Sequence, residues 1–223
     1  MRFLDIGANR GDATFAALER GYEVIAVEAA PRIFAELVKN FIYNPHVTPL
    51  RYAVSDVDYQ RVTFYEAEED GLSTLNKDWL TKDGLPYARK PFREIQATTI
   101  TIDTLANIYG DFDLIKIDVE GAEWSVLHGM TKHHGELTFE WTSATMDEHE
   151  AQLDYLYEIG YRVIAPQFIM PHLVRPRVYL PLRESNKGRL FKWHEDNAED
   201  WVDGAWRNGN LRPTADVGMI WLR

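Results

Sequence analysis

The stretch Arg2 to Gly11, RFLDIGANRG, decides the fold. Its first five residues form a short apolar run that ends at Gly7, and Asp12 to Arg20 then repeats apolar residues at helical spacing until Gly21. A strand that turns through glycines into a helix lets a ligand approach the backbone and meet the unpaired N–H groups of the helix. The pattern therefore predicts either a ligand site at the first turn or a tight turn alone.

Strands and helices alternate from this turn onward. Glu23 to Glu28 is apolar between its two terminal glutamates, a composition typical of buried parallel strands. Pro31 then precedes a helix over Arg32 to Ile42, because proline is tolerated in a first helical turn. With a third strand over Val47 to Val54, the first 54 residues read β-α-β-α-β and indicate a parallel doubly wound sheet.

The middle of the chain is less regular. We expect a strand over Arg61 to Glu66, a long loop over Ala67 to Lys90 at the sheet edge or over a site, and a strand over Gln96 to Ile102. The remaining elements are expected to be helices at 103–109, 122–127 and 147–159 and strands at 113–117, 136–141, 161–165 and 216–222.

Composition limits the function. The 223 residues include 35 acidic and 24 basic ones, a formal net charge of −11, which argues against general nucleic-acid binding. The chain has no cysteine, so disulfides, a thiolate nucleophile and a cysteine zinc site are excluded, and a cytoplasmic location is expected. No run of about 18 apolar residues is present, so we expect no membrane span.

Acidic residues end the first two strands. Asp5 can accept hydrogen bonds there, and Glu28 stands where an acidic residue would take both hydroxyls of a ribose. The alternative is that Glu28 is a solvated strand end. The turn lacks the third glycine of the dinucleotide fingerprint, since its spacing is Gly7-x-x-x-Gly11 with Asn9 between, and it lacks the ending of a P-loop.

A D-x-G-x-x-x-G turn with an acidic second-strand end resembles the S-adenosylmethionine site of class I methyltransferases. More specifically, the chain is similar to FkbM-type methyltransferases over roughly residues 1–166. Four motifs occur in that family's order: Phe3 to Gly11 (FLDIGANRG), Val27 to Pro31 (VEAAP), Tyr52 to Asp56 (YAVSD) and Ile115 to Glu123 (IKIDVEGAE). The last of these is the most specific.

The length of the chain predicts one domain over residues 1–223, at roughly 100–200 residues per domain. The resemblance implies an α/β fold with a Rossmann-like, seven-stranded, mostly parallel sheet whose last strand is antiparallel. It also implies an S-adenosylmethionine-dependent O-methyltransferase that acts on a sugar hydroxyl of a glycan or a glycosylated small molecule. In that family, the glycine turn passes under the amino-acid part of S-adenosylmethionine, and the acidic residue at the end of the second strand holds its ribose. The expected cofactor-binding residues are Asp5, Gly7, Asn9, Gly11, Glu28, Ala29, Ala53, Val54 and Asp118.

Two features depart from the family pattern. The acidic residue is usually followed by Pro or Asn-Pro, whereas here Ala29-Ala30-Pro31 follows, although the ribose contact needs only Glu28. Class I enzymes also usually carry helices before the first strand, whereas this chain begins directly at it. We therefore expect that it could be one domain of a longer, multidomain glycan-processing chain.

The catalytic candidates follow from the chemistry of methyl transfer, which must position the acceptor oxygen and remove its proton. Asp118 ends the strand expected beside the first strand, so it is the first candidate for base or orienting group. Glu140, on the next strand, is the second. We expect Lys116 to pair with a carboxylate and Glu123 to serve the helix N-terminus. Asp118 and Glu140, on adjacent strand ends, could also hold a divalent metal such as Mg²⁺ through oxygen ligands, but the sequence assigns no set of metal ligands.

The acceptor is expected to bind the insert 167–216, which joins the last two strands. Its first part is basic, with Arg175, Arg177, Arg183, Lys187, Arg189 and Lys192 against Glu184. Trp193, Trp201 and Trp206 follow and suit stacking on a sugar ring, or they pack as the core of a lid. His172 and His194 could also reach the acceptor. His133, His134 and His149 are expected at the surface.

Two rival functions stay open. An NAD-dependent oxidoreductase would need the missing third glycine. A non-catalytic nucleotide-binding module of the same fold is disfavoured by the joint presence of Asp5, Glu28 and Asp118.

Overall fold

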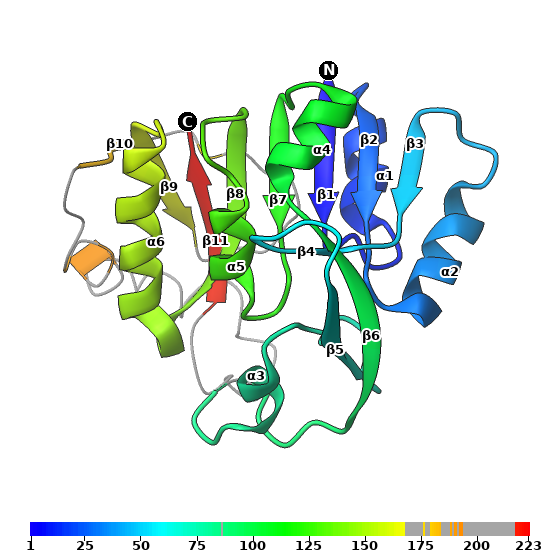
Figure 1. Cartoon of the computed structure of the whole chain (residues 1–223). Helices are drawn as coiled ribbons and strands as arrows, with labels where there is room; N and C mark the ends of the chain where they lie inside the picture. Colours follow the sequence, from blue (N-terminus) through cyan, green and yellow to red (C-terminus); the bar gives the residue numbers. More distant parts are fainter. Residues whose placement is uncertain are drawn as a thin grey trace, which may run out of the picture.

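A mostly parallel sheet forms the centre of the computed structural model (Figure 1). The structure describes residues 1–85, 87–167, 176, 179–183, 188, 190, 192–193 and 217–223. The central strands are β1 (Arg2–Ile6), β2 (Glu23–Val27), β3 (Val47–Leu50), β7 (Leu114–Ile117), β8 (Glu136–Thr142), β9 (Val163–Gln167), β10 (Leu180–Pro181) and β11 (Val217–Leu222).

The strand order is β10-β9-β11-β8-β7-β1-β2-β3. Pairs β1–β2, β2–β3, β1–β7 and β7–β8 are parallel, whereas β11 runs antiparallel to both β8 and β9. The mostly parallel sheet with an antiparallel last strand is therefore confirmed. The seven expected strands are joined by an eighth, the two-residue β10, which pairs with the edge of β9.

Helices cover both faces of this sheet. They are α1 (Asp12–Leu18), α2 (Pro31–Phe41), α4 (Ile102–Tyr109), α5 (Glu123–His128) and α6 (Met146–Glu158). Side chains alternate along β1, so Phe3 packs in the cluster with α1 and α2, while Leu4 and Ile6 pack in the cluster with α4, α5 and α6. This burial on both faces explains the nearly continuous apolar runs of the central strands.

A smaller sheet lies at the carboxyl ends of the central strands (Figure 1). It consists of β4 (Ala53–Val54), β5 (Arg61–Ala67) and β6 (Phe92–Ile100), in the order β4-β6-β5. The expected strand over Val47 to Val54 is therefore wrong in extent. Its last two residues leave the edge of the central sheet and pair with Thr99 and Ile100 of β6.

The segment 67–90, expected to be a loop, contains the short helix α3 (Lys77–Thr81). Asn76 caps it, because its side chain accepts a hydrogen bond from the backbone N–H of Asp78. Trp79 and Leu80 of this helix are buried. The segment thus packs against the rest of the molecule at the carboxyl edge of the central sheet.

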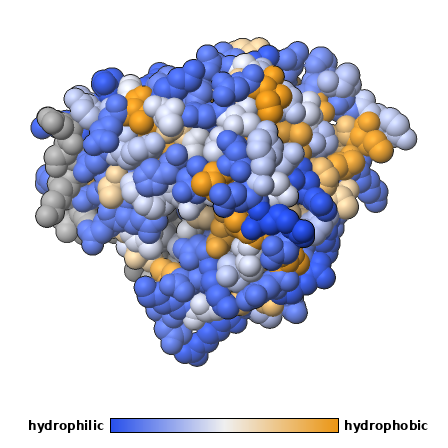
Figure 2. Space-filling model, viewed as in Figure 1, coloured by the Kyte–Doolittle hydropathy of each residue, from blue (hydrophilic) through white to orange (hydrophobic). Residues whose placement is uncertain are grey.

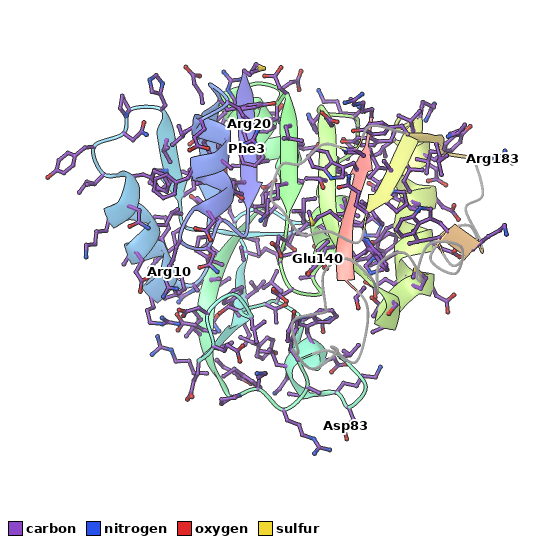
Figure 3. All side chains as sticks on the ribbon, turned by 180° about the vertical axis from the view of Figure 1, so that it is seen from behind. Phe3, Arg10, Arg20, Asp83, Glu140 and Arg183 are labelled. Atoms are coloured by element: carbon purple, nitrogen blue, oxygen red, sulfur yellow. The ribbon has the colours of Figure 1, made fainter. Side chains whose placement is uncertain are left out.

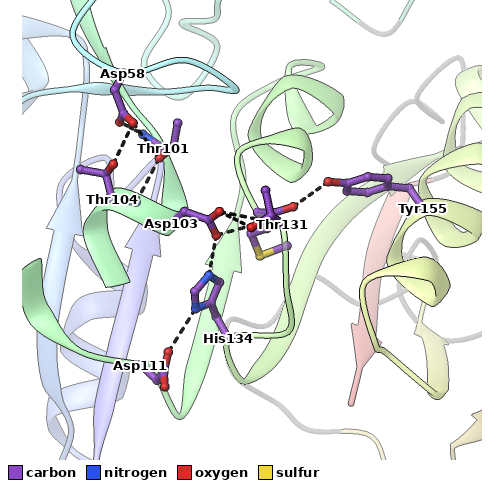
Figure 4. A network of polar contacts seen from close by, with 9 residues as sticks. Asp58, Thr101, Asp103, Thr104, Asp111, Thr131, His134 and Tyr155 are labelled. Atoms are coloured by element: carbon purple, nitrogen blue, oxygen red, sulfur yellow. Dashed lines mark hydrogen bonds and ion pairs between the residues drawn. The ribbon is translucent and has the colours of Figure 1, made fainter. Parts of the chain in front are cut away.

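Two of the three histidines expected at the surface are buried. His134 is 2% exposed because Asp103 and Asp111 flank its ring, with distances of 2.6 Å to Nε2 and 3.1 Å to Nδ1 (Figure 4). His149 is 4% exposed because α6 packs against β8, and its Nε2 accepts the backbone N–H of Thr142 at 3.0 Å. Burial lowers the pKa of His149 to about 4, so this ring is neutral at pH 7.

The face shown in Figure 2 is mostly hydrophilic, with hydrophobic residues in separate groups. In the described part of the chain, no helix combines the length and the apolar character that a membrane span requires.

Candidate active site

The turn after β1 is built around two glycines that no other residue could replace without a clash. Gly7 has φ 72°, and a Cβ there would lie 1.8 Å from the carbonyl oxygen of Asp118. Gly11 has φ 98°, and its Cβ would lie 2.3 Å from the ring of Phe41. Glycine at these positions lets the turn lie directly against the end of β7 on one side and against α2 on the other.

Glu28 follows β2 and is 8% exposed. Its Oε2 accepts the backbone N–H of Asn9 at 3.0 Å, and its Oε1 accepts the backbone N–H of Ala30 at 2.8 Å. Burial raises the pKa of this carboxyl to about 7, against the effect of those two hydrogen bonds. The carboxylate is thus held in one orientation while each oxygen keeps a further lone pair for a ligand.

A cavity opens where β1, β2 and β7 end, with Glu28 in its wall. This is the topological switch point, where strand order reverses and where α/β sheets bind ligands. The backbone turn, the end of β2, β4, the segment 71–75 and the end of β7 line it. Seven of the nine predicted cofactor residues are in the lining: Gly7, Asn9, Glu28, Ala29, Ala53, Val54 and Asp118.

The two other predicted cofactor residues lie behind the turn. Asp5 is fully buried, and its Oδ2 accepts the hydroxyl of Thr14 at 2.7 Å. Gly11 packs on Phe41. Within the cavity, the side-chain oxygen of Asn9 is buried and has no hydrogen-bond partner in the protein, so it is free to meet a polar ligand. A glycine-walled cavity with a fixed carboxylate and a free amide oxygen fits S-adenosylmethionine.

Lys116 lies beneath Asp118 and is 3% exposed. Its Nζ is 3.1 Å from Oδ2 of Asp118 and 3.6 Å from Oδ1 of Asp5, so the expected pairing with a carboxylate is confirmed. Burial alone would lower the pKa of the ammonium, but the two carboxylates outweigh it and raise the pKa to about 12. Lys116 is therefore charged and fixes one oxygen of Asp118.

Asp118, Glu120 and Glu140 meet above this lysine, with one oxygen of each lying within 4.8 Å of the others. Glu140 comes from β8 and is 7% exposed; Figure 3 shows it at the end of the central sheet that faces the α3 segment. The pKa of both Glu120 and Glu140 is raised well above the usual range. Burial is the largest cause, and repulsion from neighbouring carboxylates adds to it.

Glu120 is the member of this group that the sequence analysis did not single out, although it lies within the IKIDVEGAE motif. It has φ 57°, and its Oε2 accepts the indole N–H of Trp79 at 3.1 Å. Glu123, expected to serve the helix N-terminus, accepts the backbone N–H groups of Val119 and Gly121 through Oε1. Its role is thus local, as predicted.

A second cavity, of about 190 Å³, adjoins the carboxylates from the side of β8 and α3. Glu140 is in its wall together with two buried indoles, Trp79 and Trp141. Its polar lining includes Asn76, Asp78 and Thr142. The three carboxylates therefore lie between this cavity and the cavity at the glycine turn, which Asp118 and Glu120 line.

The model of the family described as "Methyltransferase FkbM domain" matches residues 5–163, more than half of the chain. The chain belongs to the FkbM methyltransferase family. It is accordingly an S-adenosylmethionine-dependent methyltransferase, and the family favours methyl transfer over the NAD-dependent alternative. No protein of curated function matches the chain significantly.

Solved methyltransferase structures resemble the chain only distantly. Fibrillarin of Aeropyrum pernix with natively bound S-adenosyl-L-methionine is 11% identical, with a TM-score of 0.46, over 100% of this chain and 66% of that one. Precorrin-6y C5,15-methyltransferase of Geobacter metallireducens is 11% identical, with a TM-score of 0.43, over 100% and 80%. An S-adenosylmethionine-dependent O-methyltransferase of Thermotoga maritima is 14% identical, with a TM-score of 0.40, over 99% and 58%.

Within this FkbM domain, the segment 67–85 is held across the carboxyl ends of the central strands. Asp70 pairs with Arg10 of the glycine turn and with Arg32 of α2. At the other end, the side-chain amide of Asn76 donates to the carbonyl of Gly121 at 2.9 Å. The segment supplies lining residues to both cavities, as the expectation of a loop over a site anticipated.

The FkbM match ends before the insert 167–216. Trp193 is described and packs on Trp141, with ring centroids 5.7 Å apart at 83°. Trp201, Trp206, His172 and His194 lie outside the described residues, as do most of the basic residues of the insert. The acceptor-recognition lobe therefore stays a prediction, and the packing of Trp193 favours the core alternative for that residue.

Proposed function

We propose that this methyltransferase acts on oxygen, and that its acceptor is a sugar hydroxyl of a glycan or a glycosylated small molecule. The observation that carries the proposal is the position of Asp118 and Glu140, which lie together between the two cavities. A sugar hydroxyl is a poor acid, so its methylation needs a base at the point of transfer. Carboxylates at this point supply one.

The cavity at the glycine turn is proposed to hold S-adenosylmethionine, which supplies an electrophilic methyl group on a sulfonium. The carboxylate of Glu28 accepts the ribose hydroxyls, because its two oxygens are already aimed by Asn9 and Ala30. The backbone of the glycine turn lies under the amino-acid part. Ala29, Ala53 and Val54 form the small apolar wall of the same cavity.

Asp118 is proposed to orient the acceptor hydroxyl and to take its proton. The new bond forms between the acceptor oxygen and the methyl carbon as the bond from that carbon to sulfur breaks, and the hydroxyl proton passes to the carboxylate. Lys116 holds Oδ2 of Asp118, which leaves Oδ1 for the acceptor. Glu140 is the second candidate for this role, since it borders the second cavity.

The second cavity is proposed to hold the acceptor. Trp79 and Trp141 contribute apolar atoms to its wall, and Asn76, Asp78 and Thr142 contribute hydrogen-bonding groups, a combination that suits a sugar ring with its hydroxyls. The basic residues of the insert add the prediction that the acceptor is acidic or phosphorylated. A cytoplasmic location likewise stays a prediction from the sequence.

Mass spectrometry of candidate glycans after incubation with methyl-labelled S-adenosylmethionine tests this function. We expect the label on a hydroxyl oxygen of at least one glycan, with equimolar S-adenosylhomocysteine formed. Label on nitrogen alone would contradict oxygen specificity. Tight cofactor binding with no transfer to any acceptor of this class would instead favour the non-catalytic alternative.

A further inference from the structure

Glu140 is a buried residue whose carboxylate has no partner among the described residues. The residue is 7% exposed, yet in the described part of the chain its oxygens accept no hydrogen bond and form no ion pair. Buried polar groups in proteins are normally satisfied, and a buried carboxylate is costly to leave unpaired. This carboxylate lies with Asp118 and Glu120, where a bound cation would supply the missing partner.

Among the described residues, the positive charge around these carboxylates is too small to balance them. Lys116 contacts Asp118 and Asp5, which already outnumber it. Among the described residues, no Lys, Arg or His nitrogen lies within ion-pair distance of Glu120 or Glu140. Counting the described residues alone, the three clustered carboxylates therefore carry an excess of negative charge that a proton or a cation would offset.

We infer that Asp118, Glu120 and Glu140 bind one hard divalent cation, of the kind that prefers oxygen ligands: Mg²⁺, Mn²⁺ or Ca²⁺. One oxygen of each carboxylate lies within 4.8 Å of the others. Oxygens on opposite sides of such an ion are about 4–5 Å apart, twice the usual metal–oxygen distance. All three ligands are carboxylate oxygens, a set typical of these ions rather than of zinc or copper.

Two of the ligands are held in place before an ion arrives. The indole N–H of Trp79 fixes Oε2 of Glu120, and the ammonium of Lys116 fixes Oδ2 of Asp118. Each of these carboxylates keeps its other oxygen for the ion, and Oδ1 of Asp118 has a second lone pair that can still accept the acceptor hydroxyl. Such contacts behind the ligands orient them and are characteristic of built metal sites.

The ion would lie between the two cavities, where it could take part in methyl transfer. This role rests on the proposed function. Three protein ligands leave coordination positions open, and oxygen atoms of an acceptor in the second cavity can fill them. A cation bound there would lower the pKa of a coordinated hydroxyl and position it beside the glycine-turn cavity. Acceptors with two neighbouring hydroxyls are therefore the favoured class.

Calorimetric titration of the whole chain with Mn²⁺, in the absence of acceptor, tests the site. We expect one Mn²⁺ per chain, and at least tenfold weaker binding in Glu140→Gln and in Glu120→Gln. The control is Glu148→Gln, an exposed carboxylate at the second cavity but outside the cluster, for which Mn²⁺ affinity should not change. Absence of saturable binding, or equal affinity in Glu140→Gln, would overturn the inference.

The same variants separate this inference from the proposed function. Circular dichroism checks that they fold, and Glu140→Gln should keep its S-adenosylmethionine affinity within about threefold, because this residue does not line the glycine-turn cavity. Methyl transfer that continues unchanged in EDTA would overturn a role for the ion and leave the function standing. Stoichiometric Mn²⁺ binding without any methyl transfer would support the ion site and contradict the function.

Discussion

Asp118→Asn is expected to lower methyl-transfer turnover by about 10²–10⁴, the usual contribution of a general base. The amide keeps the shape of the side chain but cannot take the acceptor proton, and it no longer balances the charge of Lys116, whose ammonium lies 3.1 Å away. Cofactor affinity should change far less than turnover. Steady-state kinetics beside calorimetric titration of S-adenosylmethionine measure the two effects separately.

Asp83→Asn is the matched control for this change. Asp83 forms an exposed ion pair with Arg89, with side-chain exposures of 72% and 79%, and it lines neither cavity. Its turnover should equal that of the unchanged chain. Nearly full turnover in Asp118→Asn would move the base to Glu140, and Glu140→Gln would then be the variant that loses activity.

Glu28→Ala is expected to weaken S-adenosylmethionine binding at least about tenfold. The change removes two charge-assisted hydrogen bonds to the ribose, each worth about 1.5–3 kcal/mol. It also releases the backbone N–H groups of Asn9 and Ala30, so the glycine turn loses part of its support. Calorimetry measures the affinity, and thermal denaturation shows how much of the loss accompanies a weaker fold.

Glu23→Ala provides the comparison, because Glu23 begins the same strand and is exposed. Its affinity for the cofactor should not change. An unaltered affinity in Glu28→Ala would refute the assignment of Glu28 to the ribose.

The same carboxyl predicts a pH dependence. Its pKa in the folded chain is raised to about 7, above the value of 4.5 for an ordinary glutamate. S-adenosylmethionine affinity should therefore increase as the pH rises through about 7, because the ionised form is the better acceptor for hydroxyls. The contribution of Glu28 to the free energy of unfolding runs the other way and decreases from about pH 4.5 to 7, since the folded chain holds the proton longer.

The part of the fold that local patterns determine could be predicted from the sequence. The apolar run at β2 indicates a buried strand, and the proline that begins α2 indicates the start of a helix. The alternation of such elements was enough to predict the parallel sheet. The end of the third strand could not be predicted, because Ala53 and Val54 pair with β6, more than forty residues further along the chain. Likewise β10 is only Leu180–Pro181 and exists through its pairing with β9.

The residues of the site likewise include some that could be predicted from the sequence and some that could not. Glu28, Asp118 and Glu140 were predicted because parallel strands bring their carboxyl ends to one edge. Glu120 could not be singled out, because its orientation depends on Trp79, a residue of the segment 67–90 that we expected to be a loop. The burial of His134 could not be predicted, because the two carboxylates that flank its ring, Asp103 of α4 and Asp111, are more than twenty residues away in the sequence.

A crystal structure of the chain with S-adenosylhomocysteine tests the central claim most directly. We expect the nucleoside in the cavity at the ends of β1, β2 and β7, with both ribose hydroxyls on the carboxylate of Glu28 and the sulfur on the side of Asp118. A nucleoside bound elsewhere, or one whose ribose does not contact Glu28, would contradict the account.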